Sequence, residues 1–241
     1  MSAPPAPAAG LSLGTLHVPT PVVLAPMAGI TNAAYRRLCA EQGAGLYVCE
    51  MITSRGLVEG DQRTRDMLVF DELETTRSVQ LYGTDPVYVG KAAEILCAEY
   101  GVAHIDLNFG CPAKTVNKHK GGCVLMREPE LMYEITAAVR KAVPADIPVT
   151  AKMRLGYDDR SMGVACGQAL EAAGASEIVI HARSKVDGYK PPAYWEEIAK
   201  VREAVNSHVI ANGEIWTVDD YWRCRKVSGC DDVMIGRGGV L

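Results

Sequence analysis

Short apolar runs and longer amphipathic segments alternate along almost the whole chain. Eight of the apolar runs, rich in Val, Ile and Leu, have the length and composition of buried strands. They lie at residues 22–25, 46–50, 78–81, 104–108, 149–152, 177–181, 209–211 and 233–235. A further short segment, residues 13–18, predicts a small hairpin that caps the bottom of the fold.

The segments between these runs carry apolar residues at helical spacing. The clearest, residues 85–101, begins with an Asp-Pro pair and ends at a glycine, as helices commonly do. Residue Thr217 is a candidate N-cap for the last segment. The other predicted helices cover residues 128–143, 164–175, 193–205 and 217–229.

This alternation favours parallel βα units, and eight such units favour an α/β fold of the (β/α)8, or TIM barrel, type. The alternative is an open doubly wound sheet, but "APMAGIT" follows the first strand where that fold would carry GxGxxG. The sequence ends with "MIGRGGVL" at the eighth strand. A complete barrel would cover that strand with an eighth helix, so we expect a barrel truncated after strand eight.

The composition narrows the function classes. A net charge of −4 and a pI of about 5.8 argue against a protein that coats nucleic acid generally, although a local basic patch remains compatible. No apolar run approaches the ~18–20 residues that span a bilayer. The eight cysteines show neither CxxC pairs nor zinc-like spacing. We therefore expect no metal, no membrane partner and a cytoplasmic protein with reduced thiols.

Polar residues or glycines follow almost every predicted strand, at the end where barrels gather their chemistry. The glycines of "IANGEI" and "MIGRGG" would let backbone N–H groups approach an anion, and Arg237 adds a fork-shaped cation. A ligand with a phosphate is the functional interpretation; tight turns at Gly236 and Gly238 are the structural one. The positions in chain order are Pro26-Met27, Glu50, Gln80, Asn108, Lys152, His181, Asn212-Gly213 and Gly236-Arg237.

Lys152 and Arg154 lie two residues apart in a predicted strand and so face the same side. A lysine inside a barrel needs an anionic or electron-rich partner, and a flavin ring suits it. His181 could donate to a phosphate or flavin edge, and the amide of Gln80 could pair with a heterocycle. The structural alternatives are a surface cation for Lys152 and simple packing for His181.

Cys111 lies between Gly110 and Pro112 in "FGCP", just past the fourth predicted strand. The lysine-rich stretch that follows, "KTVNKHK", could position RNA phosphates or form a solvated surface. A thiol held in such a turn can deliver a proton. The other cysteines are interpreted as small apolar residues.

Taken together, seven stretches resemble the tRNA-dihydrouridine synthase family in order and spacing. The resemblance covers roughly residues 20–241; the second half is closer to the bacterial C-type enzymes and the first half to the B-type. The stretches are "LAPMAGITNAAYRRL", "SVQLYG", "HIDLNFGCPAKTVNKHKGG", "AKMRLG", "HARS", "ANGEIW" and "MIGRGG".

The resemblance implies an FMN-dependent oxidoreductase in which NADPH is the reductant and a D-loop uridine of tRNA becomes 5,6-dihydrouridine. It implies that Cys111 is the catalytic proton donor, that Asn108 and Arg154 hold the uracil, and that Tyr189 belongs to the substrate site near the flipped base. The FMN contacts that it implies are Pro26, Met27, Ala28, Gln80, Lys152, His181, Asn212, Gly213, Glu214, Gly236 and Arg237.

Two domain expectations follow. Residues 1–12, which begin with a Pro/Ala-rich run, predict a disordered tail, and residues 13–241 predict the FMN-binding barrel. Family members continue with a last barrel helix and a helical tRNA-binding domain, and we expect this chain, a monomer, to lack both. The alternatives are another FMN barrel that acts on a free pyrimidine, similar to dihydroorotate dehydrogenases, and an inactive FMN-binding fragment. The basic stretch after Cys111 favours tRNA.

Overall fold

The computed structural model describes residues 10–18, 20, 22–74 and 76–240. Nine parallel strands form one sheet in the order β4-β3-β11-β10-β9-β8-β7-β6-β5. Their bounds are β3 (Val22–Leu24), β4 (Leu46–Tyr47), β5 (Ile52–Thr53), β6 (Ser78–Tyr82), β7 (His104–Phe109), β8 (Val149–Arg154), β9 (Glu177–His181), β10 (His208–Asn212) and β11 (Val233–Ile235). The predicted α/β barrel is confirmed, and all eight predicted strands are found.

The sheet curls until its two ends meet. The pairing of β11 with β3 joins the last strand to the first. A parallel bridge from Val48, just after β4, to Ser78 of β6 closes the remaining gap. The predicted strand over residues 46–50 is therefore two short strands, β4 and β5. The break has a physical cause, because Val48 N donates to Leu24 O of β3 whereas Cys49 N donates to Ser78 O of β6. The chain changes its pairing partner here and cannot continue as one strand.

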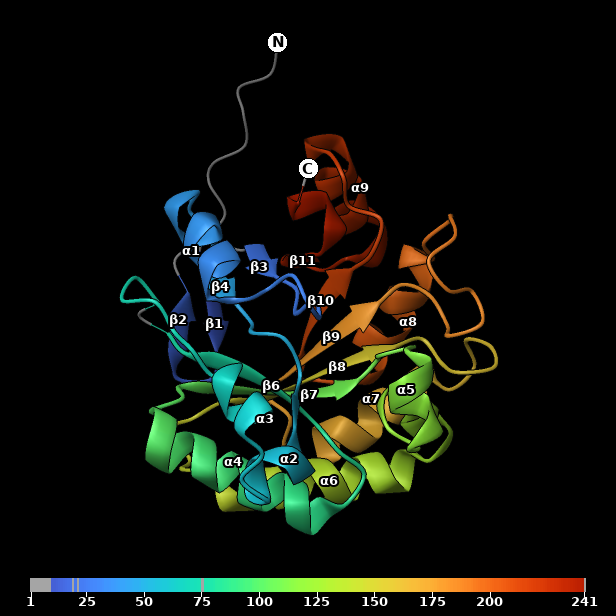
Figure 1. Ribbon diagram of the computed structural model, residues 1–241. Coiled ribbons are helices and arrows are strands. Elements are labelled where there is room, and N and C mark those ends of the chain that lie inside the picture. Colours follow the sequence, from blue (N-terminus) through green and yellow to red (C-terminus); the bar gives the residue numbers. More distant parts are fainter. Residues whose placement is uncertain (1–9, 19, 21, 75, 241) are drawn as a thin grey trace.

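Helices cover the outer face of this sheet (Figure 1). All the predicted helices are confirmed: Asp85 caps α4 through Val87 N, Gly101 ends it in the left-handed conformation at φ 60°, and Thr217 forms a capping box with Asp220. The helices are α1 (Ala33–Glu41), α2 (Ser54–Val58), α3 (Gln62–Asp66), α4 (Pro86–Tyr100), α5 (Lys114–Lys118), α6 (Pro129–Ala142), α7 (Gly163–Ala172), α8 (Trp195–Ala204) and α9 (Val218–Ser228), with 3-10 turns η1 (Gly122–Arg127) and η2 (Arg237–Gly239).

Among the described residues, no helix is both long enough and apolar enough to cross a bilayer.

The predicted hairpin is present as β1 (Leu11–Leu13) paired antiparallel with β2 (Leu16–Val18). It starts two residues earlier than expected, because Leu11 is 2% exposed and packs with the residues inside the barrel. Of the tail predicted over residues 1–12, residues 1–9 lie outside the described part of the chain.

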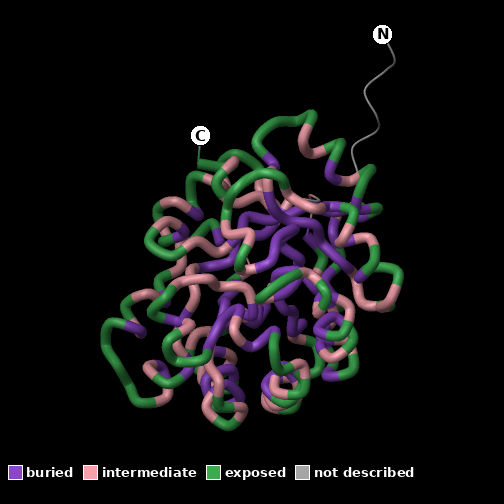
Figure 2. Tube along the Cα trace, turned by 90° about the vertical axis from the view of Figure 1, so that its right-hand side faces the viewer, coloured by how far each residue is buried: buried purple, intermediate pink, exposed green. Residues whose placement is uncertain are grey.

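Two apolar clusters sit on the two faces of the sheet. The larger one fills the space between the strands and the surrounding helices. The smaller one lies inside the barrel and joins the hairpin to inward-facing residues such as Val23, Leu46 and Ile210. In Figure 2 the buried segments run through the centre of the molecule and the exposed ones lie around it.

The barrel interior is polar on its other side. The residues that share the inner face of β6, β7 and β8 include Ser78, His104 and Thr150, all at most 2% exposed. Buried polar groups must bond to one another, and here Ser78 Oγ lies 2.6 Å from His104 Nδ1 while His104 Nε2 lies 2.9 Å from Thr150 Oγ1. Glu177 begins β9 beside them, and its Oε2 has no hydrogen-bond partner among the described residues.

The buried Glu177 should make the stability of the fold depend on pH. Burial, with the neighbouring Asp106 and Asp232, raises the pKa of Glu177 well above its ordinary value. The folded chain therefore keeps this carboxyl protonated, whereas the unfolded chain loses the proton above about pH 4.3. Its contribution to stability is present at low pH and is lost as pH rises, at about 1.4 kcal/mol per pH unit.

Glu177→Gln cannot ionise and removes this dependence. The free energy of unfolding of the wild type, minus that of the variant, should fall as pH rises above about 5 in urea titrations. The exposed Glu196→Gln on α8 is the control and should show a flat difference. A flat difference for Glu177→Gln as well would mean that this carboxyl ionises in the folded chain.

Candidate active site

A cavity of about 640 Å³ opens at the carboxyl ends of the barrel strands. Every residue that the sequence assigned to catalysis, cofactor or substrate lines this one cavity. They are Pro26, Met27, Ala28, Gln80, Asn108, Cys111, Lys152, Arg154, His181, Tyr189, Asn212, Gly213, Glu214, Gly236 and Arg237. The structure thus brings the predicted residues together, while the role of each one stays a prediction.

The loop after β3 forms one rim of the cavity. Thr31 ties it closed, accepting from Met27 N at 3.0 Å and donating to Met27 O. Glu50, which the sequence placed at the end of the second strand, accepts from Gly29 N at 2.7 Å. This carboxylate anchors the loop from outside and does not itself line the cavity.

The turn that carries Cys111 is held by two asparagines. Asn108 Oδ1 accepts from Gly110 N at 3.1 Å and from Cys111 N at 2.9 Å. Asn117 of α5 donates to Cys111 O at 2.9 Å, so the helix formed by part of the basic stretch "KTVNKHK" supports the turn that carries the thiol. Gly122 has φ 63°, and a Cβ there would lie 2.5 Å from Cys111 O, so this position needs glycine. The thiol is part-buried at a fixed place on the cavity wall.

Lys152 reaches the cavity from β8. Its Nζ donates to Asn212 Oδ1 at 3.1 Å, and Asn212 in turn donates to Met234 O at 2.9 Å. Burial, followed by repulsion from Arg154, lowers the pKa of Lys152 to about 8. A positive charge therefore sits against the cavity at a cost in free energy, and an anionic ligand would relieve that cost.

Arg154 locks two loops together. Its Nε donates to Gly110 O at 2.9 Å, and its Nη1 donates to Ser184 O at 2.9 Å and Gly188 O at 3.0 Å. The guanidinium also lies 5.0 Å from the ring centre of the half-exposed Tyr189. Arg154 thus fixes the Cys111 turn relative to the loop that carries Tyr189.

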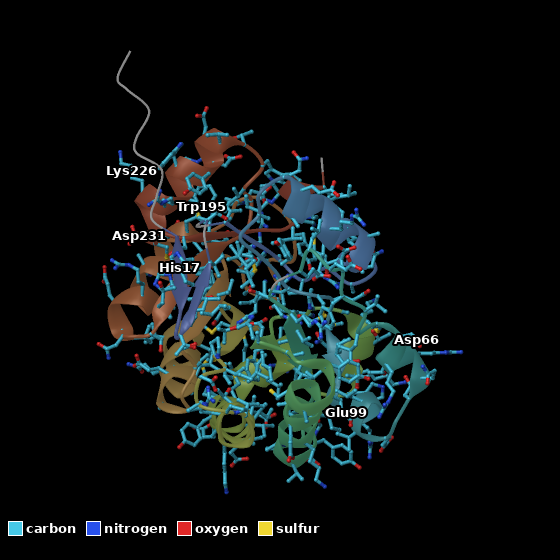
Figure 3. The ribbon with its side chains drawn as sticks, turned by 90° about the vertical axis from the view of Figure 1, so that its left-hand side faces the viewer. His17, Asp66, Glu99, Trp195, Lys226 and Asp231 are labelled. Atoms are coloured by element: carbon cyan, nitrogen blue, oxygen red, sulfur yellow. The ribbon has the colours of Figure 1, made fainter. Side chains whose placement is uncertain are left out.

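His181 ends β9 and is 8% exposed. Burial and the charges of Arg154 and Lys152 lower its pKa well below the ordinary value, so the ring is neutral. Its Nδ1 has no partner within the part of the chain that the structure describes. Gly213, at φ 113°, lies so close that a Cβ would meet the His181 ring at 3.3 Å. Trp195, labelled in Figure 3, fixes this approach by donating to Gly213 O at 2.8 Å.

Three further residues belong to the site and were missed. Arg183, fully buried, pairs with Glu214, and Trp216 Nε1 donates to the other oxygen of that carboxylate at 2.9 Å. Arg237 lies between two aromatic rings, 5.0 Å from Tyr189 and 5.1 Å from Trp216. The quoted stretches "HARS" and "ANGEIW" contain Arg183 and Trp216, so their position next to assigned residues was the available signal.

Asp106 is the third of these missed residues. It is 1% exposed and accepts from Gln80 Nε2 at 2.6 Å. It lies two residues before Asn108 on the same face of β7, and that spacing could have indicated it from the sequence.

These groups suit a negatively charged, partly aromatic ligand. Lys152, Arg154 and Arg237 line the cavity, whereas Glu214 is the acidic residue among the described lining residues and is already paired with Arg183. Gly238 lies so close to Ile215 that a Cβ would come within 2.1 Å of its carbonyl oxygen, which keeps the turn after β11 tight. No group of residues suited to a metal ion occurs in the described ranges.

Comparison with known proteins points to one family. The sequence pattern described as "Dihydrouridine synthase (Dus)" matches residues 23–240. A tRNA-dihydrouridine(16) synthase of Pseudomonas syringae pv. tomato is 57% identical over 166 residues, 69% of this chain and 52% of that protein. A protein of the same name from Cupriavidus necator is 45% identical over 224 residues, 90% of this chain and 69% of that protein. One from Neisseria meningitidis serogroup B is 41% identical over 230 residues, 92% of this chain and 68% of that protein.

The chain thus spans about half the length of the first of these relatives. The match of the family pattern runs from β3 through η2 and includes every residue of the cavity that the sequence assigned.

The lowered pKa of Lys152 should give stability a second dependence on pH. Since the unfolded side chain titrates near pH 10.4, the folded chain binds fewer protons than the unfolded chain between about pH 8 and pH 10. Stability should therefore rise with pH in that range. Lys152→Met removes the charge, so in the ligand-free protein at neutral pH it should raise the free energy of unfolding by about 1–3 kcal/mol.

The gap between Lys152→Met and wild type should close as pH approaches about 10. Lys141→Met, on the exposed face of α6, should show no such trend. A Lys152→Met variant that is less stable than wild type by the same amount at every pH would contradict a costly buried charge.

Proposed function

The chain belongs to the dihydrouridine synthase family, and from this premise we propose that its barrel binds FMN and reduces a tRNA uridine to 5,6-dihydrouridine with NADPH. The observation that carries the proposal is one cavity that joins Lys152, His181 and the glycine turns after β10 and β11 with a thiol on its wall. Membership of this family supports dihydrouridine synthesis, and the chemistry of the cavity supports a flavin cofactor.

The residues present fit FMN. Arg237 with the backbone of Gly236 would hold the phosphate, and the close turn at Gly213 leaves room for a ligand against the strand ends. The unpartnered Nδ1 of His181 offers a hydrogen-bonding atom at the same place. When bound, FMN supplies the hydride transfer that connects NADPH to the uracil ring.

Lys152 would stabilise negative charge that develops on its bound partner. Its ammonium group is held by Asn212 at 3.1 Å and carries a pKa lowered to about 8, so it gains most from a partner that becomes more negative. An interaction that strengthens as negative charge develops lowers the barrier as well as the ground state. Gln80 would pair with the edge of the heterocycle through its amide.

The uracil would lie between the cofactor and the Cys111 turn. Asn108 and Arg154 supply amide and guanidinium donors, and Tyr189 supplies a half-exposed ring at the mouth of the cavity. Cys111 would donate its thiol proton to uracil C5. The hydrogen bonds that Asn108 and Asn117 make to this turn hold the thiol in place for that transfer.

A uridine inside a folded tRNA has to leave its stack to reach this cavity. Lys114, at the start of α5, lines the cavity, and Lys118 and Lys120 follow on the exposed surface. These cations would contact tRNA phosphates beside the extruded base. The names of the curated relatives refer to position 16, and we extend that target in the D-loop to this chain. All eight cysteines are free, which suits the reducing cytoplasm where tRNA is modified.

The first test of the proposal is whether the purified protein has the yellow colour of a bound flavin. The purified protein should carry FMN and absorb near ~450 nm, a property of oxidised flavins. Arg237→Ala should weaken FMN binding by about 10- to 100-fold, the effect of losing a charged hydrogen bond to phosphate. Arg63→Ala, exposed on α3, is the matched control and should bind normally. A folded, colourless protein that added FMN does not reconstitute would refute flavin binding.

The second test addresses the proton donor. Cys111→Ala should retain FMN and NADPH oxidation but form dihydrouridine in tRNA about 10²- to 10⁴-fold more slowly, because general acid catalysis is lost. Cys97→Ala and Cys123→Ala serve as controls; burial raises the pKa of both thiols, as expected for packing residues. Dihydrouridine formation at the normal rate in Cys111→Ala would remove the thiol from the mechanism.

A further inference from the structure

A continuous chain of hydrogen bonds crosses the polar side of the barrel and ends at the Cys111 turn. Its lower half runs from Ser78 through His104 and Thr150 to Asp106, with Thr150 Oγ1 donating to Asp106 Oδ1 at 2.7 Å. Thr150 has one hydroxyl proton, which it gives to Asp106, so it accepts from His104 Nε2. His104 is then neutral and accepts at Nδ1 from Ser78, in line with a pKa that burial lowers to about 4.

The upper half leads from Asp106 to the turn. Gln80 Nε2 donates to Asp106 Oδ2 at 2.6 Å, and Asn108 Nδ2 donates to Gln80 Oε1 at 2.8 Å. Asn108 Oδ1 then accepts from the backbone N–H groups of Gly110 and Cys111. Asp106 therefore reaches the Cys111 turn through two side-chain amides.

We call the hydrogen bonds from Asp106 through Gln80 and Asn108 to the Cys111 turn the relay. Which group donates and which accepts in each of these bonds is fixed from both ends. A carboxylate offers only acceptors, so it selects the NH₂ group of Gln80 and turns the Gln80 oxygen toward Asn108. A backbone N–H offers only a donor, so the turn selects the oxygen of Asn108 and leaves its NH₂ group for Gln80. The two requirements agree, and each amide has one orientation that satisfies both of its neighbours.

We propose that Asp106 is a positioning residue that holds the Cys111 turn in place by setting the orientation of the Gln80 and Asn108 amides. The hydrogen bonds carry this inference by themselves; it rests on the proposed function only in making Cys111 the group whose position matters. The side chain of Asp106 lies below the cavity and does not line it, so it reaches the turn through Gln80 and Asn108.

Asp106→Leu tests the relay, because leucine branches at the same side-chain atom but offers no acceptor. Gln80 Nε2 then loses its partner, so Gln80 no longer holds the Asn108 amide in one orientation. The hydrogen bonds that Asn108 Oδ1 accepts from Gly110 and Cys111 should then open more often. Hydrogen exchange of these two amides, followed by NMR, should become at least about fivefold faster, the effect of losing about one net hydrogen bond.

Internal and matched controls separate this effect from general loosening. The amides of Leu155 and Ala182 donate to Arg183 O and Asn212 O elsewhere at the same end of the barrel, and their exchange should not change. Thr150→Val breaks the same network on the other side of Asp106. It should lower the thermal unfolding midpoint yet leave the exchange of Gly110 and Cys111 unchanged relative to Leu155 and Ala182.

A double-mutant cycle tests the path. Gln80→Leu removes the link between Asp106 and Asn108, so it should accelerate exchange at Gly110 and Cys111, and adding Asp106→Leu should have no further effect. The alkylation rate of Cys111 by iodoacetamide, read by peptide mass spectrometry, should follow the same pattern.

The outcomes are decisive. Unchanged exchange in folded Asp106→Leu, or effects of Asp106→Leu and Gln80→Leu that simply add, would overturn the relay. Should Asp106→Leu fail to fold, Gln80→Leu alone decides: faster exchange confined to Gly110 and Cys111 supports the relay, and any other result refutes it. These measurements use the purified protein without tRNA or NADPH. A failure to form dihydrouridine would therefore refute the proposed function and leave the relay standing.

Discussion

Polar side chains inside a closed barrel must find their hydrogen-bond partners there, because water does not reach them freely. This constraint governs the inner face of β6, β7 and β8, where Asp106 accepts from both Thr150 and Gln80. Once those bonds are made, the orientations of the neighbouring side chains are no longer free. The placement of Asn108, and with it the turn that carries Cys111, follows from the same network.

The barrel interior is divided between two kinds of packing. Apolar residues from β3, β4, β10 and β11 pack against the hairpin and close the lower end of the barrel. The polar residues of β6 to β8 lead upward to the cavity, where Lys152 and Arg154 hold positive charges against it. An apolar floor on one side and a bonded polar wall on the other give the cavity a rigid lining, so a ligand meets groups that are already oriented.

The charges of the cavity are poorly balanced within the protein itself. Lys152 has an asparagine as its hydrogen-bond partner among the described residues, Arg154 donates to backbone carbonyls, and Glu214 is taken by Arg183. A site of this kind destabilises the empty protein and favours an anionic ligand, which is the exchange of stability for binding that functional sites commonly show. It accords with the FMN-dependent reduction of a tRNA uridine that we propose for this chain.

The sequence by itself determined the strand and helix order, because strand-length apolar runs and helical spacing depend on local pattern, and the N-cap at Thr217 and the stop at Gly101 depend on local backbone chemistry. It also indicated the residues of the cavity, because the ends of parallel strands meet at one side of a barrel. Only the tertiary structure decided that the second strand breaks at Val48, since that depends on which neighbour each backbone amide finds across the closing seam. It also showed which partners Arg183, Trp216 and Asp106 have in the site; the sequence hinted at these residues only through their closeness to assigned ones, because their partners lie far apart in the chain. Glu214 pairs with Arg183 across 31 positions and Asp106 bonds Gln80 across 26, and such distant pairings are created by the closure of the barrel and are invisible to local pattern.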